Sequence, residues 1–369
     1  MKLIRIRAVA KKELIQIWRD PLSLAMAFLM PLMLLFIFGY AITLDVNNLK
    51  TVVCDLDRSS LSRELVSGIS ASGYFRIVGH LTDQTGIDGY LDSGKALMAI
   101  TIPSDFSEAM AKGRDVQVQV VMDGSDSNTA TIGLGYITAA VGKFSEKVSI
   151  QKRQRLIDPR IRVWYNPELR SRNFIIPGLI AVIMAVIAAL LTSLTIAREW
   201  ERGTMEQLIS TPVTSHELIL GKLLPYFMIG FIDVVLSVLL ARSLFDVPLK
   251  GSIFLLMALS GIFLFGGLSL GILISVVAKT QLVASQVSMV VTFLPAFLLS
   301  GFMYAISNMP EFLQVVTHII PARYFVTILK GIFLKGSTID LLLTETALLS
   351  FFGLAVFAIA NRKFRKRID

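Results

Sequence analysis

The stretch FIIPGLIAVIMAVIAALLTSLTIA occupies residues Phe174–Ala197, and REWERGTMEQLISTPVTSHEL follows it at Arg198–Leu218. The first stretch contains no charged side chain, whereas the second is rich in charge. A segment that crosses the hydrocarbon core of a membrane needs roughly 20 apolar residues. The two stretches together therefore predict a membrane-spanning helix that leads into a charged loop.

The spacing within the charged stretch predicts one short helix between two long ones. Thr204 and Gln207 form the S/T-x-x-E/Q pair of a capping box, so a helix can begin at Thr204 after a break at Gly203. Pro212 ends that helix, because proline has no N–H to donate and its ring clashes with the preceding turn. Thr214–Glu217 holds a second capping box, which begins the next helix. On spacing alone, an ordinary cytoplasmic loop and a docking helix for a soluble partner both fit.

Composition indicates an integral membrane protein. The chain has 369 residues, of which 54% are hydrophobic, and its mean hydropathy of +0.67 is too high for a soluble globular protein. The net charge is +9, but the basic residues cluster beside apolar runs, where they act as topology signals rather than as a nucleic-acid surface. The single cysteine, Cys54, excludes an intramolecular disulfide, and its strand-like surroundings predict a buried small side chain.

Residues 1–21 predict a basic amphipathic helix that lies along the inner membrane surface as an interfacial connector. Pro21 ends this helix, and Leu22–Leu44 then spans the membrane. A cleavable signal peptide is the alternative, since Gly39–Ala41 resembles a cleavage site. The apolar run is about twice as long as a signal-peptide core, which favours an uncleaved first span.

Residues 45–173 differ in composition, because charges return and strand-like runs alternate with helical ones. This alternation predicts a small α/β domain between spans one and two. The expected strands are Lys50–Asp55, Tyr74–Val78, Ala96–Ile102 and Val116–Met122, and the expected helices are Ser59–Ser70, Ser104–Lys112 and Asn128–Arg155.

Residues 174–369 predict five more spans, which gives six transmembrane helices in all. Their expected limits are Phe174–Ala197 and about Leu223–Phe245, Gly251–Val277, Leu282–Tyr304 and Leu341–Ala360. Basic residues at both ends of the chain and in the charged loop place all three in the cytoplasm, so the α/β domain is expected to be extracytoplasmic. At about 307–336, Pro310 and Pro321 interrupt two apolar helices that are too short to span, which predicts a re-entrant hairpin on the outer side.

Residues suited to catalysis are scarce. His80, His216 and His318 fall in different predicted compartments, so neither a metal site nor an acid–base pair is predicted. Gly89–Ala96 comes within one residue of a phosphate-binding P-loop, but it has alanine where the magnesium ligand belongs and it precedes a strand. We therefore expect no catalytic residue, metal, cofactor or nucleotide site in this chain.

Asp233 is the one acidic residue well inside a predicted span, and Arg242 lies toward the outer end of the same span. An acidic side chain at that depth is costly to bury unpaired and is a functional candidate by default. The two residues are therefore candidates for the translocation path or its supporting network, and a polar anchor between helices is an equal alternative. Gly267–Gly271 is a GxxxG pair, which predicts close helix packing without specifying an oligomer.

Three motifs at characteristic separations run along nearly the whole chain. They are Lys12-Glu13-Leu14 with Trp18-Arg19-Asp20-Pro21; Arg198-Glu199 through Glu201-Arg202-Gly203-Thr204, Glu206-Gln207-Leu208 and Thr211-Pro212; and Leu299-Ser300-Gly301-Phe302 through Asn308-Met309-Pro310, Pro321, Arg323-Tyr324-Phe325 and Gly331-Ile332-Phe333. Together they resemble the permeases of the type 2 exporter family of ABC transporters, and in particular bacterial multidrug exporter permeases. Ala305 departs from the resemblance, since members commonly have proline there.

The resemblance implies a connector helix, six spans and a coupling helix at about 204–210 that seats in a groove of a separate ATP-binding subunit. It also implies that two such subunits bind the ATP and magnesium, that a second copy or a homologous permease completes the assembly, and that this chain is not itself an enzyme. The expected location is the bacterial inner membrane with both termini cytoplasmic. The residues implied in coupling are Glu199, Glu201, Arg202, Glu206 and Gln207, with Gly203, Thr204 and Pro212 setting the helix ends.

Two other classes of protein compete with this interpretation. An ion-coupled carrier would use Asp233, but the chain lacks a second midplane acid and a hydropathy repeat between its halves. A ligand sensor would need a cytoplasmic output domain, and few residues follow the last span. We expect an ATP-driven exporter of amphipathic drugs or lipid-like compounds that contacts membrane lipids, with the substrate class resting on resemblance alone. Whether the outer domain meets a periplasmic adaptor or caps the exit stays open.

Overall fold

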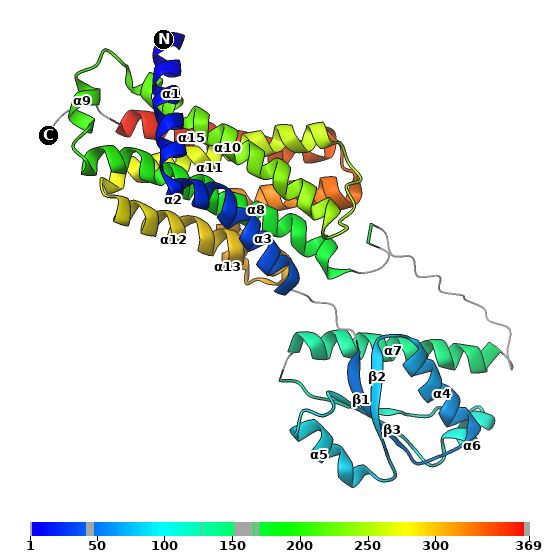
Figure 1. Ribbon diagram of the computed structural model, residues 1–369. Helices are drawn as coiled ribbons and strands as arrows, with labels where there is room; N and C mark the ends of the chain where they lie inside the picture. The colour runs from blue at the N-terminus through cyan, green and yellow to red at the C-terminus, as the bar shows by residue number, and fades with distance from the viewer. Residues whose placement is uncertain (1, 42–47, 126, 151–164, 167–169, 365–369) are drawn as a thin grey trace. The chain divides into compact units, whose positions relative to one another are not determined.

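The computed structural model describes residues 2–41, 48–125, 127–150, 165–166 and 170–364. The chain divides into two compact units, Met1–Thr43 with Val163–Asp369, and Leu44–Arg162. We call the first the helical unit and the second, which contains a four-stranded sheet, the α/β unit (Figure 1).

Five helices of the helical unit are long and apolar enough to cross a membrane. Each contains most of one of the predicted spans two to six, and the chain is therefore a multi-pass membrane protein. The five are α8 (Ser171–Glu201), α10 (Ser215–Ser243), α11 (Ile253–Ala278), α12 (Gln281–Leu299) and η6 with α15 (Ile339–Leu342 and Leu343–Lys363).

The first predicted span is a helical stretch with an irregular turn. The short helix α2 (Pro21–Leu24) runs into a π-helical turn, η1 (Ala25–Leu29), and then into α3 (Met30–Ala41). The apolar part, Ala25–Ala41, is shorter than the five long helices, and residues 42–44 lie outside the described residues. A total of six spans therefore stays a prediction.

The proline-interrupted region forms two short helical pieces with a sharp bend. One piece is α13 with η4 (Glu311–Val316 and Thr317–Ile319) and the other is α14 with η5 (Pro321–Lys330 and Gly331–Lys335), and they meet at 89°. Pro321 begins the second piece, where its missing N–H costs no helical hydrogen bond. Lys330 is accommodated by the carbonyl oxygen of Gly301, 2.9 Å from its Nζ, and by the ring of Phe174.

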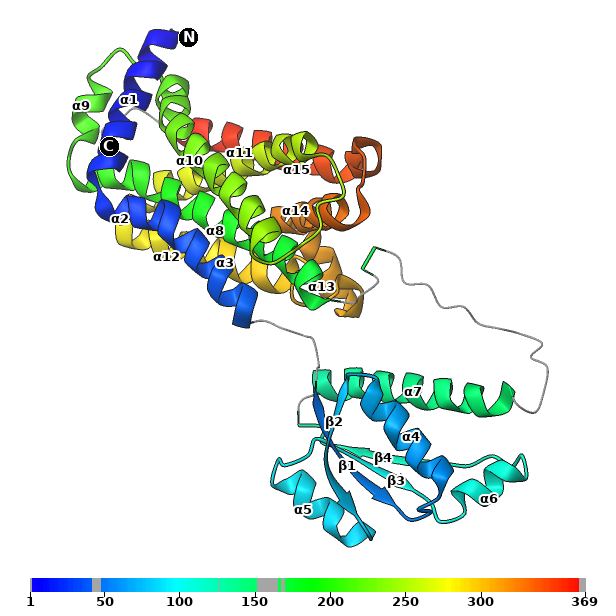
Figure 2. The same cartoon turned by 45° about the vertical axis from the view of Figure 1, so that its right-hand side comes forward.

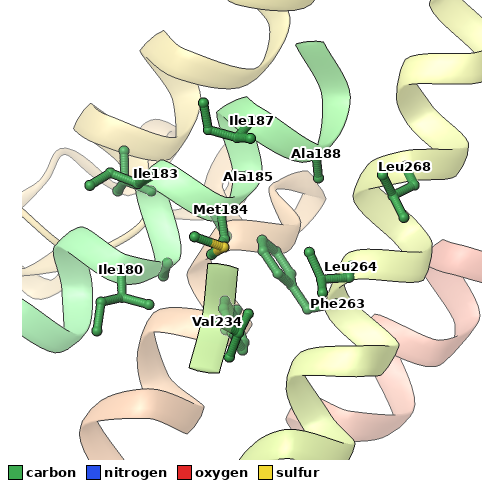
Figure 3. Close-up of a cluster of buried hydrophobic side chains, with 14 of the residues drawn as sticks. Ile180, Ile183, Met184, Ala185, Ile187, Ala188, Val234, Phe263, Leu264 and Leu268 are labelled. Atoms are coloured by element: carbon green, nitrogen blue, oxygen red, sulfur yellow. The ribbon is translucent and has the colours of Figure 1, made fainter. Parts of the chain in front are cut away.

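Helix α8 is the centre of the helical unit, with most of its side chains buried. Figure 3 shows Met184 of α8 in one apolar cluster with Phe263 and Leu264 of α11 and Val234 of α10. A side chain at Gly271 would overlap the hydroxyl of Thr192 on α8, so the GxxxG pair serves packing within one chain. The hydroxyl of Thr192 donates to the carbonyl of Leu268, 2.8 Å away, across the same contact.

The α/β unit contains all four predicted strands, in the order β2-β1-β3-β4. Strand β1 pairs in parallel with β2 and β3, and β3 pairs antiparallel with β4. The strands are β1 (Leu49–Asp55), β2 (Phe75–Leu81), β3 (Met98–Ile102) and β4 (Gln119–Met122). Cys54 is a buried free thiol on β1, as predicted.

Helices cover both faces of this sheet. Helices α4 (Ser60–Ala71), α6 (Phe106–Ala111) and α7 (Ser127–Ile150) pack on one face, and α5 (Ile87–Asp92) packs on the other (Figure 2). Sequence reasoning missed α5. It overlaps the first half of the stretch that resembles a P-loop, and strand β3 follows that stretch, so no helix begins after it to bind a phosphate at its N-terminus.

A loop at the end of β1 is held by acidic side chains. Asp57 accepts hydrogen bonds from the backbone N–H and the hydroxyl of Ser107, at 3.3 and 2.9 Å, which ties this loop to α6. Although burial opposes ionisation, hydrogen bonds from Ser59 and Ser107 hold the pKa of the Asp57 carboxyl below its usual value.

Candidate functional site

The short helix predicted between the two long ones is present as α9 (Met205–Ile209). Helix α8 ends at Glu201, and Gly203 then takes a φ of +69°, a left-handed conformation that favours glycine. Both views place α9 at the same end of the helical unit as α1 (Leu3–Arg19) (Figure 1; Figure 2).

The capping box predicted at the start of α9 is wrong. Thr204 has helical backbone angles and its side chain makes no capping hydrogen bond. Its hydroxyl instead donates to the carboxylate of Glu199, which is a stronger acceptor than a neutral group. The second capping box is confirmed, since Thr214 and Glu217 exchange side-chain and backbone hydrogen bonds at 3.0 and 3.4 Å.

Helix α9 has one fixed side and one free side. Met205 is buried and Leu208 packs partly against the core of the helical unit. Glu206 and Gln207 are exposed, as is Arg202 just before the helix. The helix is therefore held in place while it presents an acidic and an amide side chain to the outside.

A buried lysine joins three helices close to α9. Lys222 of α10 is 1% exposed, and its Nζ lies 2.5 Å from Glu13 Oε1 of α1 and 3.3 Å from Glu199 Oε1 of α8. The two glutamates are likewise buried. We call Glu13, Glu199 and Lys222 the buried triad.

The charges around the buried triad balance. Lys12 of α1 also bonds Glu199, so two lysines face two carboxylates. Charges taken out of water are tolerated only when they are paired and hydrogen-bonded, and removal of one partner of such a pair typically costs about 3–5 kcal/mol. Because the hydroxyl of Thr204 reaches the same Glu199, the start of α9 is linked to α1, α8 and α10 through one side chain.

Further polar contacts bind the end of α8 to its neighbours. Arg198 forms an ion pair of 3.2 Å with Asp20 and donates to Gln281 at the start of α12. Glu201 accepts from the side-chain and backbone N–H groups of Gln281, at 2.7 and 3.1 Å. The loop after α9 is tied to α1 as well, because Arg5 donates to the carbonyl of Pro212, 2.5 Å away.

The predicted coupling residues thus fall into two groups. Glu199, Glu201 and Thr204 make hydrogen bonds within the helical unit, although Glu201 is exposed. Arg202, Glu206 and Gln207 are exposed. Their role in coupling stays a prediction.

Sequence reasoning missed Lys222, which pairs with both Glu13 and Glu199, and it missed Glu13 as the second carboxylate of the triad. A signal existed for Glu13, because it lies four residues from Val9 and from Ile17, on the buried face of α1.

Comparison with known proteins decides the family. Residues 21–361 match the family model described as ABC-2 family transporter protein. The chain belongs to the ABC-2 transporter family.

Relatives of this ABC-2 transporter protein are known in Escherichia coli strain K12. The chain is 38% identical to the probable multidrug ABC transporter permease YbhS, over 99% of this chain and 98% of the relative. It is 32% identical to the probable multidrug ABC transporter permease YbhR, over 97% and 99%. The inner membrane transport permease YhhJ is 29% identical over 88% of this chain and 87% of its own length.

Asp233 and Arg242, the candidates for the translocation path of this ABC-2 protein, do not meet. Asp233 of α10 is 0% exposed, and within the described residues both of its carboxylate oxygens lack a hydrogen-bond partner. Arg242 is exposed, and no ion pair joins the two side chains in the described part of the chain. The structure therefore shows Asp233 as an unpartnered buried acid, and its role stays a hypothesis.

Metal ligands are not gathered in the part of the chain that the structure describes. Over those residues, no group of three or more histidine, cysteine, aspartate or glutamate side chains could hold a metal ion.

Proposed function

We propose that this chain is the membrane-spanning permease subunit of an ATP-driven exporter, with ATP and magnesium bound by a separate subunit. In this proposal α9 is the coupling helix, and its exposed face docks on that subunit. The export substrates are amphipathic drugs or lipid-like compounds taken from the cytoplasm or the inner leaflet.

One observation carries the proposal: a short exposed helix is joined through Thr204 and Glu199 to the buried triad. A displacement of α9 by a partner bound at the exposed Glu206 and Gln207 would move α1, α8 and α10 together, because the charged side chains that connect these helices are buried and paired. An ordinary loop needs no such connection. The names of the E. coli relatives, which are multidrug and inner-membrane transport permeases, support the substrate class and the location.

The proposed assembly contains two ATP-binding subunits and two permeases, the second being another copy or a homologue. We place the protein in a bacterial inner membrane with both termini, α1 and α9 in the cytoplasm, since basic residues gather there. The α/β unit would then be extracytoplasmic, where it meets a periplasmic adaptor or caps the exit.

The experiment is affinity purification of the tagged full-length protein in mild detergent, with and without Glu206→Lys. We expect the natural chain to retain an ATP-binding subunit and the variant to lose it, because the reversed charge would be repelled by the surface on which α9 docks. ATP-dependent export should fall with the loss of that subunit, while the variant still inserts into the membrane.

A matched control is Glu311→Lys. Glu311 is also an exposed acid in the first turn of a short helix, but α13 lies away from α9 in both views (Figure 1; Figure 2). This control should keep the ATP-binding subunit. Unchanged partner binding and export in Glu206→Lys would remove α9 from the coupling role.

The alternative, an ion-coupled carrier that uses Asp233, is not favoured by the family assignment. It makes a distinct prediction: purified protein in liposomes would transport without ATP, driven by a proton or sodium gradient. Such transport, lost in Asp233→Asn, would replace the exporter proposal.

A further inference from the structure

An apolar cavity of about 300 Å³ lies inside the helical unit, away from the buried triad. Its walls come from α8, α11, α12, α15 and the bend between η4 and α14. Ala185 and Phe263, both labelled in Figure 3, belong to this lining. The volume is at the lower end of the range of about 300–1,000 Å³ typical of small-molecule sites.

The lining of this cavity selects an uncharged occupant. It contains no charged side chain, and its one hydroxyl, on Thr292, is committed to the carbonyl of Ser288 at 2.7 Å. Apolar cavities do not hold water well, because water needs several polar partners. A hydrocarbon chain that entered would instead gain van der Waals contacts on all sides.

The cavity reaches the surface of the helical unit between α12 and the bend that joins η4 to α14. Val291 of α12 is 45% exposed and Ile319 at the bend is 77% exposed, and both line the cavity. Their exposed neighbours on α12, Val290 and Leu294, are apolar too. An exposed apolar face on a membrane-spanning helix is suited to contact with lipid, and a lipid chain is an apolar group that can then reach the opening.

A cation lies beside the same opening. Arg323 follows Ala322 of the lining, and its Nη1 bonds Thr317 and lies 3.0 Å from Nδ1 of His318, next to Ile319. Every contact of this guanidinium that involves a described residue uses Nη1 or the ring of Tyr324. Nε and Nη2 are therefore available as donors, and a guanidinium binds a phosphate with paired N–H groups.

We propose that this cavity is a phospholipid site, in which one acyl chain enters between Val291 and Ile319 and the phosphate binds Arg323. The site is separate from α9 and from ATP coupling. The proposed site explains why an apolar cavity lies next to an arginine with two available donor groups. Neither close packing nor a water-filled path would require the two together.

The experiment uses full-length protein in vesicles of phosphatidylglycerol that carries a diazirine on one acyl chain, without ATP or a partner subunit. After illumination, labelled positions are found by peptide mass spectrometry. Labelling of Phe263 or Ala296, two buried residues of the lining, is expected in the natural chain. Val291→Trp should abolish that labelling, because the larger side chain blocks the opening.

Val290→Trp is the matched control, since Val290 is exposed one residue earlier on α12 and is not part of the lining. It should leave the interior labelling intact. Labelling confined to the outside of the helices, or interior labelling that survives Val291→Trp, would overturn the site.

A second comparison tests the phosphate contact. The same diazirine chain is presented on diacylglycerol, which lacks a phosphate, and the interior labelling by the two lipids is compared. Phosphatidylglycerol should label more in the natural chain, and this preference should vanish in Arg323→Gln. Equal labelling by both lipids in the natural chain would reject Arg323 as the phosphate contact.

Discussion

Lys222 and Asp233 lie on the same helix, α10, and both are buried, yet they differ in their surroundings. Lys222 has two carboxylates within 3.3 Å. Asp233 has no hydrogen-bond partner within the described residues. A buried charge with partners from two other helices holds those helices together. A buried acid without partners lowers the free energy of unfolding.

The difference in surroundings indicates separate roles for the buried triad and for Asp233. The buried triad connects α1, α8 and α10 to the start of α9, so its loss should affect folding and coupling together. Within the described residues Asp233 makes no hydrogen bond, so its presence at a buried position calls for another reason, of which a role on the translocation path is one. Substitution of each residue by an apolar one should therefore change stability in opposite directions.

The largest effect is expected for Lys222→Met. This change keeps an unbranched side chain but leaves Glu13 and Glu199 buried, with Lys12 as the one lysine among the described residues that still contacts them. Breaking a buried pair in this way lowers the free energy of unfolding by about 3–5 kcal/mol. Thermal unfolding in one detergent, with Lys363→Met as an exposed control, measures the change. A midpoint equal to that of the control would show that the triad does not hold the helices together.

The second prediction concerns Asp233→Leu. Removing a buried polar group without partners should raise the free energy of unfolding by about 1–3 kcal/mol, the opposite sign to Lys222→Met. Asp233→Asn keeps the size and polarity and should change stability less. Transport in liposomes separates the roles, since loss in both variants with retained ATP-binding subunit would place Asp233 on the path. A destabilised Asp233→Leu would reveal a partner for the carboxylate, such as a second permease.

Much of the fold follows from patterns that the sequence displays directly. Uncharged runs predicted spans two to six, and alternating polarity predicted all four strands of the α/β unit. The π-helical turn at Ala25–Leu29 was not predicted. Pro31 follows it closely and lacks the N–H of a regular helical bond, but a proline marks a helix irregularity without specifying its kind. Helix α5 was missed because its six residues are too few for a helical period to show.

The position of the candidate site could be predicted from the sequence, but its hydrogen bonds and ion pairs could not. Gly203 and the confirmed capping box at Thr214 placed α9 correctly. The hydroxyl of Thr204 met a carboxylate brought in by tertiary folding, and this charged acceptor replaced the local capping bond. Glu13 and Lys222 are 209 positions apart in the sequence, and no local pattern announces a pairing over that distance.

The smallest effect is expected for Lys12→Ala, which tests whether burial rather than charge separates the two lysines on Glu199. Lys12 bonds this carboxylate as Lys222 does, but its side chain is 46% exposed. Water screens an exposed ion pair, so its loss should lower the free energy of unfolding by only about 0–1 kcal/mol, and by less at high salt. Thermal unfolding of Lys12→Ala and of Lys222→Met, each at low and at high salt, measures the loss of stability and its dependence on salt. If Lys12→Ala were as destabilising as Lys222→Met and insensitive to salt, the net charge around Glu199, and not the burial of Lys222, would determine stability.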